Sequence, residues 1–323
     1  MTEQRRSAAD DETRPETAYS LRPFWRPRYW PVWLVWAWIA VMARLPFPWQ
    51  IKIGKRLGRA LMPVLTRQRT AAERNLAICF PELDAQQHRE LVTKQFESYG
   101  ASLSEMGVGW HTPLDKLKEI VRVEGKEHLD AAMADGKGVI LFTAHFTCLE
   151  VGVAILEDLC RNCGCMYRPQ RNAMFDTMIL RGRSRFAKRQ IDKNDVRTLF
   201  RSLRSAMAIA YLPDHTYTGS HSELLPFFGE PAVTNTATSK IARLSGAKVL
   251  PYFFRRNADD SGYRVDIGPP LDGFPTEDAA ADTSRLVRLL EDYIRLAPEQ
   301  YLWTYRKFKG RPAGYPDVYA PPA

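Results

Sequence analysis

Two residues near the middle of the chain have the types and spacing for acid–base chemistry. His145 directly follows the apolar run 138–144, and Glu150 comes five residues later. A histidine can take a proton from a hydroxyl group near neutral pH, and a carboxylate can hold its imidazole in one tautomer. On one continuous helix the two would point about 140° apart, at ~100° per residue. They can therefore meet only if His145 lies in a loop or cap before the helix that carries Glu150.

The spacing alone is weak evidence, because six histidines and 37 acidic residues give about one such pair by chance. A capping histidine beside a solvated glutamate is the structural alternative. The position of His145 strengthens the catalytic interpretation. The short, apolar run before it predicts a buried strand, and in open α/β sheets ligands bind beyond the carboxyl ends of strands.

Strands and helices alternate around this pair. After helices expected at 71–80 and 84–107, strands are expected at 121–124, 138–144, 163–167, 206–212, 247–255 and 263–267. The helices expected between and after them are 127–135, 146–159, 173–189, 195–204, 236–245 and 283–296. This order predicts an α/β fold, with a mainly parallel central sheet flanked by helices.

Five short motifs follow one another along the chain. They are 142–150 (FTAHFTCLE), 166–169 (MYRP), 211–215 (YLPDH), 226–229 (PFFG) with threonines in 234–238, and 303–309 (WTYRKFK) followed by Arg311-Pro312. Together they resemble the late acyltransferases of lipid A biosynthesis, the lauroyl and myristoyl transferases. That family belongs to the wider group of glycerolipid acyltransferases with a His-x4-Asp/Glu motif. The resemblance covers about residues 25–315.

The resemblance implies a fold like that of glycerol-3-phosphate acyltransferase and an acyl-transfer reaction without a covalent intermediate. A fatty acyl chain would move from acyl carrier protein to a hydroxyl of a 3-hydroxyacyl chain on a Kdo-bearing lipid A precursor. His145 would be the general base, and Glu150 would hold it and stabilise the imidazolium. The mechanism requires neither a cofactor nor a metal. The same chemistry on another acceptor, such as a glycolipid, an aminolipid or a lysophospholipid, is the alternative.

Several basic residues are candidates for binding the substrates. Arg168 follows a predicted strand and could face the thioester carbonyl or a phosphate, or it could be a surface arginine stacked on Pro169. Asp214 could orient Arg168 or cap a turn. Six cations would suit an acidic carrier protein or a phosphorylated lipid, although solvated surfaces are their ordinary explanation. These are Arg181, Arg185, Lys188 and Arg189 on one predicted helix, and Arg306 and Lys307 near the carboxyl terminus.

The amino-terminal region is both basic and aromatic. Residues 17–72 hold ten of the 46 basic residues and no acidic one, and six of the eight tryptophans lie between Trp25 and Trp49. The charge-free run 30–43 predicts a hydrophobic membrane-anchor helix, either a short or tilted span or a helix in the membrane interface. A buried core helix is the alternative. We expect attachment to the bacterial inner membrane, with the catalytic domain on the cytoplasmic side.

Composition divides the chain into four parts. A disordered tail is expected at 1–20, the membrane anchor and a basic amphipathic segment at 21–70, the acyltransferase domain at 71–315, and a second tail at 316–323. The net charge of +9 comes from the anchor region, so the remainder offers little support for a nucleic-acid binder. Five cysteines do not form the framework of a secreted protein, and three of them within 160–165 lack the second half of a zinc site.

Overall fold

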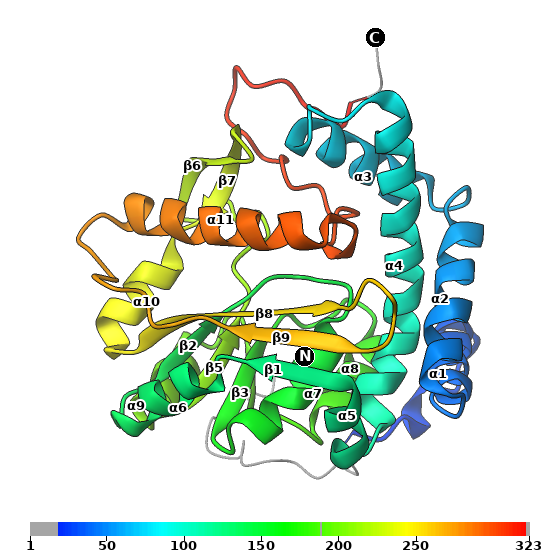
Figure 1. Ribbon diagram of the computed structural model, residues 1–323, viewed down its shortest axis with the longest axis horizontal. Coiled ribbons are helices and arrows are strands. Elements are labelled where there is room, and N and C mark those ends of the chain that lie inside the picture. Colours follow the sequence, from blue (N-terminus) through cyan, green and yellow to red (C-terminus); the bar gives the residue numbers. More distant parts are fainter. Residues whose placement is uncertain (1–18, 188, 321–323) are drawn as a thin grey trace, which may run out of the picture.

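A seven-stranded sheet lies at the centre of the computed structural model, which describes residues 19–187 and 189–320 (Figure 1). Its order is β1-β9-β8-β2-β5-β3-β4. The strands are β1 (Val121–Glu124), β2 (Val139–Phe142), β3 (Cys163–Tyr167), β4 (Arg189–Asp192), β5 (Ala208–Tyr211), β8 (Lys248–Arg256) and β9 (Tyr263–Ile267). Strands β8, β2, β5, β3 and β4 run parallel to one another, β9 is antiparallel to β8, and β1 is parallel to β9. The predicted α/β fold with a mainly parallel sheet is confirmed.

Strand β2 forms where the sequence offers four apolar residues in a row. All four are buried, as expected for a central strand whose two faces are both covered. The helices that follow β1 and alternate with the strands are α6 (Lys126–Ala134), α7 (Leu149–Leu159), α8 (Ala173–Arg183), α9 (Val196–Arg204), α10 (Ala237–Ser245) and α11 (Ala279–Leu296). The short α5 (Leu114–Ile120) precedes β1.

The helix predicted over 173–189 ends early. Helix α8 stops at Arg183, and Arg189–Asp192 forms the edge strand β4, which pairs with β3. This segment is too short and too polar to show a period of two in its sequence. Its hydrogen bonds to β3 therefore decide its conformation.

A hairpin outside the main sheet was not expected from the sequence. Strands β6 (Ser222–Phe227) and β7 (Glu230–Asn235) pair with each other only. Phe228 and Gly229 have φ angles of 50° and 80°, the left-handed conformations that a two-residue hairpin turn requires. Because the first of these positions is occupied by Phe228 and not by glycine, the turn was not recognised from the sequence.

Among the described residues, α5 is preceded by four longer helices: α1 (Trp30–Met42), α2 (Phe47–Leu61), α3 (Thr66–Cys79) and α4 (Ala85–His111). In Figure 1, α4 runs along one side of the molecule, with α1 and α2 outside it. Glycines allow α2 and α4 to touch, because a Cβ atom on Gly58 would lie 1.9 Å from the carbonyl oxygen of Phe96. Ile39 of α1 packs in a small core with Trp110 of α4 and Met178 of α8.

Within the described residues, no helix has both the length and the apolar character needed to cross a bilayer. The predicted disordered tail falls almost entirely outside those residues, as does Lys188.

Candidate active site

His145 lies in the loop between β2 and α7, at the carboxyl end of the central strand. Its neighbour Phe146 forms an isolated β-bridge with Tyr301, and the backbone N–H of Thr147 donates to the carbonyl of Gln300 at 2.8 Å. Contacts with a distant part of the chain therefore fix the loop. The expected position of His145, before the helix rather than within it, is confirmed.

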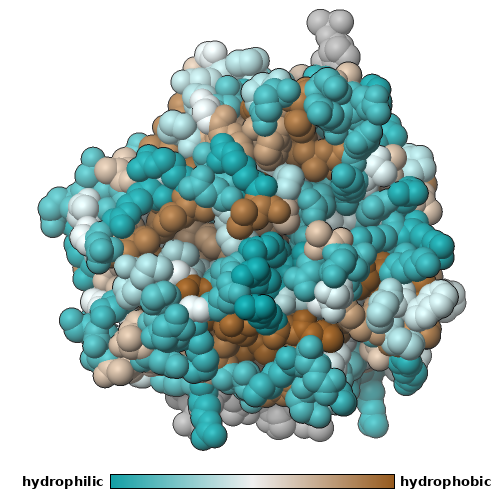
Figure 2. All heavy atoms as spheres, viewed as in Figure 1, coloured by the Kyte–Doolittle hydropathy of each residue, from teal (hydrophilic) through white to brown (hydrophobic). Residues whose placement is uncertain are grey.

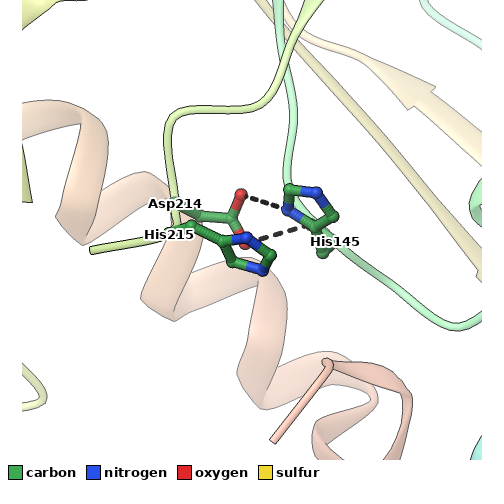
Figure 3. A group of neighbouring side chains, drawn as sticks. All are labelled: His145, Asp214 and His215. Carbon is green, nitrogen blue, oxygen red and sulfur yellow. Dashed lines mark hydrogen bonds and ion pairs between the residues drawn. The ribbon is translucent and has the colours of Figure 1, made fainter. Parts of the chain in front are cut away.

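Asp214 is the carboxylate that meets His145 (Figure 3). It follows β5, the strand beside β2. The Nδ1 atom of His145 lies 2.7 Å from Oδ1 of Asp214, and the backbone N–H of His145 donates to Oδ2 at 3.1 Å. The hydroxyl of Tyr301 also donates to Oδ2, at 3.1 Å. The carboxylate is held by three donors from two separate segments.

This pairing sets the chemistry of the imidazole. The Asp214 side chain is fully buried, whereas the His145 side chain is 27% exposed. An ionised carboxylate can only accept hydrogen bonds, so Nδ1 of His145 carries a proton and Nε2 keeps its lone pair. Burial alone would raise the pKa of Asp214, but the charge and hydrogen bonds of His145 hold that pKa well below its usual range. The pair can therefore act as a base whose developing positive charge is balanced.

Glu150 does not occupy the place that the sequence predicted for it. Its Oε2 accepts from Nε of Arg183 at 3.0 Å and from the indole of Trp110 at 2.8 Å, and its Oε1 accepts from Arg183 at 2.5 Å. Glu150 lies in the first turn of α7, on a side that faces α4 and α8. His145 pairs with Asp214 instead of Glu150, and the side chain of Asp214 contacts His145 and Tyr301.

His215 stacks on His145. The two ring centroids are 3.8 Å apart with an interplanar angle of 8°. Ligand atoms of His145, Asp214 and His215 all lie within 4.8 Å of one another, close enough to be considered as a metal site. The lone pairs of ring nitrogens lie in the ring planes, however, and two parallel stacked planes do not converge on one ion. The geometry fits a histidine–carboxylate pair better than a metal centre.

The predicted substrate-binding cations are spread over several elements. Arg168 follows β3 and is exposed at the same edge of the sheet as His145. On α8, Arg181 lies 5.8 Å from the ring of Trp36. After α8, Arg185 is exposed and donates to the carbonyl of Trp110. The single basic helix that the sequence predicted does not form.

Three other members of that set have structural partners. Arg189 begins β4 and donates to Ser202 at 3.2 Å, while the Arg306 guanidinium lies 5.2 Å from the Tyr319 ring. Lys307 is buried and donates from Nζ to the carbonyl oxygen of Asp214 at 2.8 Å. This amine holds the loop that carries the carboxylate. This role of Lys307 was not expected from the sequence, although Asp214 lies in the YLPDH motif and Lys307 in the WTYRKFK motif.

Comparison with known proteins identifies the family of this chain. A family model described as bacterial lipid A biosynthesis acyltransferase matches residues 20–310. The chain belongs to this family. It is thus an acyltransferase of lipid A biosynthesis, as the five motifs indicated.

Relatives of this acyltransferase cover nearly its whole length. The lipid A biosynthesis palmitoleoyltransferase of Escherichia coli is 35% identical over 310 residues, which are 94% of this chain and 99% of that protein. The lipid A biosynthesis lauroyltransferase of the same organism is 35% identical over 294 residues, covering 91% and 96% of the two chains. The myristoyltransferase of that organism is 26% identical over 294 residues, 91% of each chain.

Proposed function

We propose that this acyltransferase moves a fatty acyl chain from acyl carrier protein to the hydroxyl of a 3-hydroxyacyl chain on a Kdo-bearing lipid A precursor. The product would carry an acyloxyacyl group. The hydrogen-bonded pair of His145 and Asp214 is the observation that carries the proposal, because acyl transfer to an alcohol needs a base at the hydroxyl. Membership of the lipid A family supports the class of acceptor.

In the proposed reaction, His145 acts twice. Its Nε2 takes the proton of the acceptor hydroxyl as the oxygen attacks the thioester carbonyl, and Asp214 balances the imidazolium that forms. The tetrahedral intermediate then collapses, the carbon–sulfur bond breaks, and the imidazolium returns its proton to the leaving thiolate. Arg168, exposed at the same sheet edge, is the proposed contact for the thioester carbonyl or a phosphate of the acceptor.

The environment of Cys148, the cysteine nearest to His145 along the chain, favours direct attack by the acceptor hydroxyl. Cys148 is completely buried, and its Sγ lies 3.6 Å from the carbonyl oxygen of Phe254. Burial raises the pKa of this thiol far above its usual value. A buried, protonated thiol is a poor nucleophile, which supports a reaction without an acyl-enzyme intermediate.

The test is acyl transfer by the purified full-length protein with lauroyl-, myristoyl- and palmitoleoyl-loaded acyl carrier protein. The acceptors are a Kdo-bearing lipid A precursor, the same precursor without Kdo, and a lysophospholipid. We expect mass spectrometry to show the added acyl mass on the Kdo-bearing acceptor. Transfer to the lysophospholipid alone would reject the proposed acceptor. Transfer from acyl-coenzyme A but from none of the carrier-protein thioesters would reject the donor.

We also infer that α1 attaches the enzyme to the surface of the inner membrane. Trp30, Leu34 and Val41 share one face of α1 and are 60%, 73% and 55% exposed. Trp25, which precedes α1 in the chain, and Trp49, in the first turn of α2, are 68% and 54% exposed. The face shown in Figure 2 is instead covered mostly by hydrophilic side chains, with hydrophobic residues in separate patches.

Exposed cations precede and follow α1 along the chain. Arg22, Arg26, Arg28, Arg44, Lys52 and Arg56 are exposed on or beside α1 and α2. Apolar side chains on one helix face, flanked by tryptophan and positive charge, are typical of helices that lie in the interface of an anionic bilayer. The proposed orientation brings the catalytic domain to the cytoplasmic surface, where acyl carrier protein is found.

The double variant Trp30→Ser/Leu34→Ser is expected to weaken binding to vesicles that contain phosphatidylglycerol by at least about 100-fold. Burial of each large apolar side chain contributes about 1.5–3 kcal/mol. Co-sedimentation measures the partition coefficient. Leu244→Ser on α10 is the control, because Leu244 is 53% exposed but lies on another helix. Equal losses in the double variant and the control would contradict the proposed attachment through α1.

A further inference from the structure

His145 is the end of a column of stacked side chains. The rings of His145 and His215 have centroids 3.8 Å apart, and those of His215 and Tyr305 are 3.9 Å apart with an interplanar angle of 10°. The ammonium of Lys309 lies 4.6 Å from the centroid of the Tyr305 ring, on this last member of the stack. His215 therefore supports the face of the imidazole, whereas Asp214 bonds to its edge.

The two segments that build the column are tied together on both sides of His215. Before it, the carbonyl oxygen of Asp214 accepts from Nζ of Lys307 at 2.8 Å. After it, the hydroxyl of Thr216 donates to the carbonyl of Lys307 at 2.7 Å. The Tyr305 hydroxyl also lies 3.4 Å from the Thr216 carbonyl oxygen. Contacts between residues about 90 positions apart thus fix the ring of His215, so it does not depend on the substrate for its position.

The imidazole of His215 is uncharged at neutral pH. Burial lowers its pKa to about 3, and the positive charges of His145, Lys307 and Lys309 act in the same direction, against the opposing effect of Asp214. A neutral ring can lie against an imidazolium without charge repulsion, and its π face attracts a cation. The ring beneath His145 therefore remains compatible with both protonation states of the base.

We propose that His215 is a positioning residue for acyl transfer, whose flat neutral ring holds the imidazole of His145 in the plane that presents Nε2 to the acceptor hydroxyl. The proposal rests on the proposed function, in which His145 is the base. One side-chain hydrogen bond at Nδ1 leaves the imidazole free to tilt about that contact, and stacking removes this freedom. A small misplacement of a reacting group can cost about 10²-fold in rate.

The test compares His215→Phe, which keeps a flat ring, with His215→Leu, which fills the site with a side chain that is not planar. We expect His215→Phe to keep kcat within about threefold of the wild type, and His215→Leu to lower kcat by about 10- to 100-fold. KM for the donor and for the acceptor should be unchanged in both variants. Melting temperatures establish that each variant is folded.

Two results would overturn the proposal. One is a kcat for His215→Leu equal to that of the wild type. The other is equal loss in His215→Phe and His215→Leu, which would assign the effect to a ring nitrogen. If His215→Leu does not fold, Tyr305→Phe and Tyr305→Leu repeat the comparison one layer away, with a smaller loss expected for the latter. Failure of the proposed function is distinguished by the wild type and His145→Ala. An inactive wild type or a fully active His145→Ala rejects that function whatever the His215 variants do.

Discussion

Asp214→Asn is expected to lower the kcat of acyl transfer by about 10³- to 10⁴-fold, the size of effect known for the carboxylate of a serine-hydrolase triad. Both oxygens of Asp214 accept hydrogen bonds, Oδ1 from the imidazole and Oδ2 from the His145 backbone and Tyr301. An amide has only one oxygen, so one set of these donors would face an NH₂ group. The variant also lacks the negative charge that balances the imidazolium. Steady-state kinetics with the carrier-protein thioester measure this loss.

Tyr301→Phe is the control for the hydrogen-bond network around Asp214. It removes one donor to Oδ2 and leaves the carboxylate and its contacts with His145 in place. We expect a loss in kcat of about 10- to 100-fold, since a hydrogen bond to a charged group contributes about 1.5–3 kcal/mol. A folded Asp214→Asn variant as active as Tyr301→Phe would contradict the assignment of Asp214 as the partner of the base.

Glu150→Gln is expected to reduce the free energy of unfolding by about 3–5 kcal/mol, because it leaves Arg183 buried without its counter-charge. The side chains of Arg183 and Glu150 are only 9% and 10% exposed. Burial alone would lower the pKa of Arg183, but the carboxylate of Glu150 raises it above its ordinary value. Denaturant unfolding measures the loss, and the kcat of the folded variant should fall far less than that of Asp214→Asn.

Two further variants separate a buried ion pair from a catalytic carboxylate. Adding Arg183→Met to Glu150→Gln should recover much of the lost stability, because the unpaired charge is then absent. Glu73→Gln breaks the exposed pair of Arg69 and Glu73, whose side chains are 37% and 50% exposed, and should change stability by less than about 1 kcal/mol. A Glu150→Gln variant of normal stability and with activity as low as that of Asp214→Asn would restore the original prediction that Glu150 acts on His145.

Local sequence patterns predicted the central elements well. The apolar run before His145 forms β2, and residues 263–267 form β9 with the expected bounds. The edge strand Arg189–Asp192 and the β6–β7 hairpin were missed, because their conformations depend on pairing with other strands. A polar segment of four residues such as Arg189–Asp192 has no sequence pattern that would predict its hydrogen bonds to a neighbouring strand.

The sequence by itself determined that a histidine stands at the end of a buried strand, within motifs typical of lipid A acyltransferases. These features depend on neighbouring residues, so they can be recognised along the chain. The tertiary structure alone decided which carboxylate meets that histidine. Asp214 is 69 residues from His145 along the chain, and it lies beside His145 because β5 pairs with β2. The first turn of α7 instead directs Glu150 toward Arg183 and Trp110. Strand order is set by packing of the whole sheet, which no local spacing encodes.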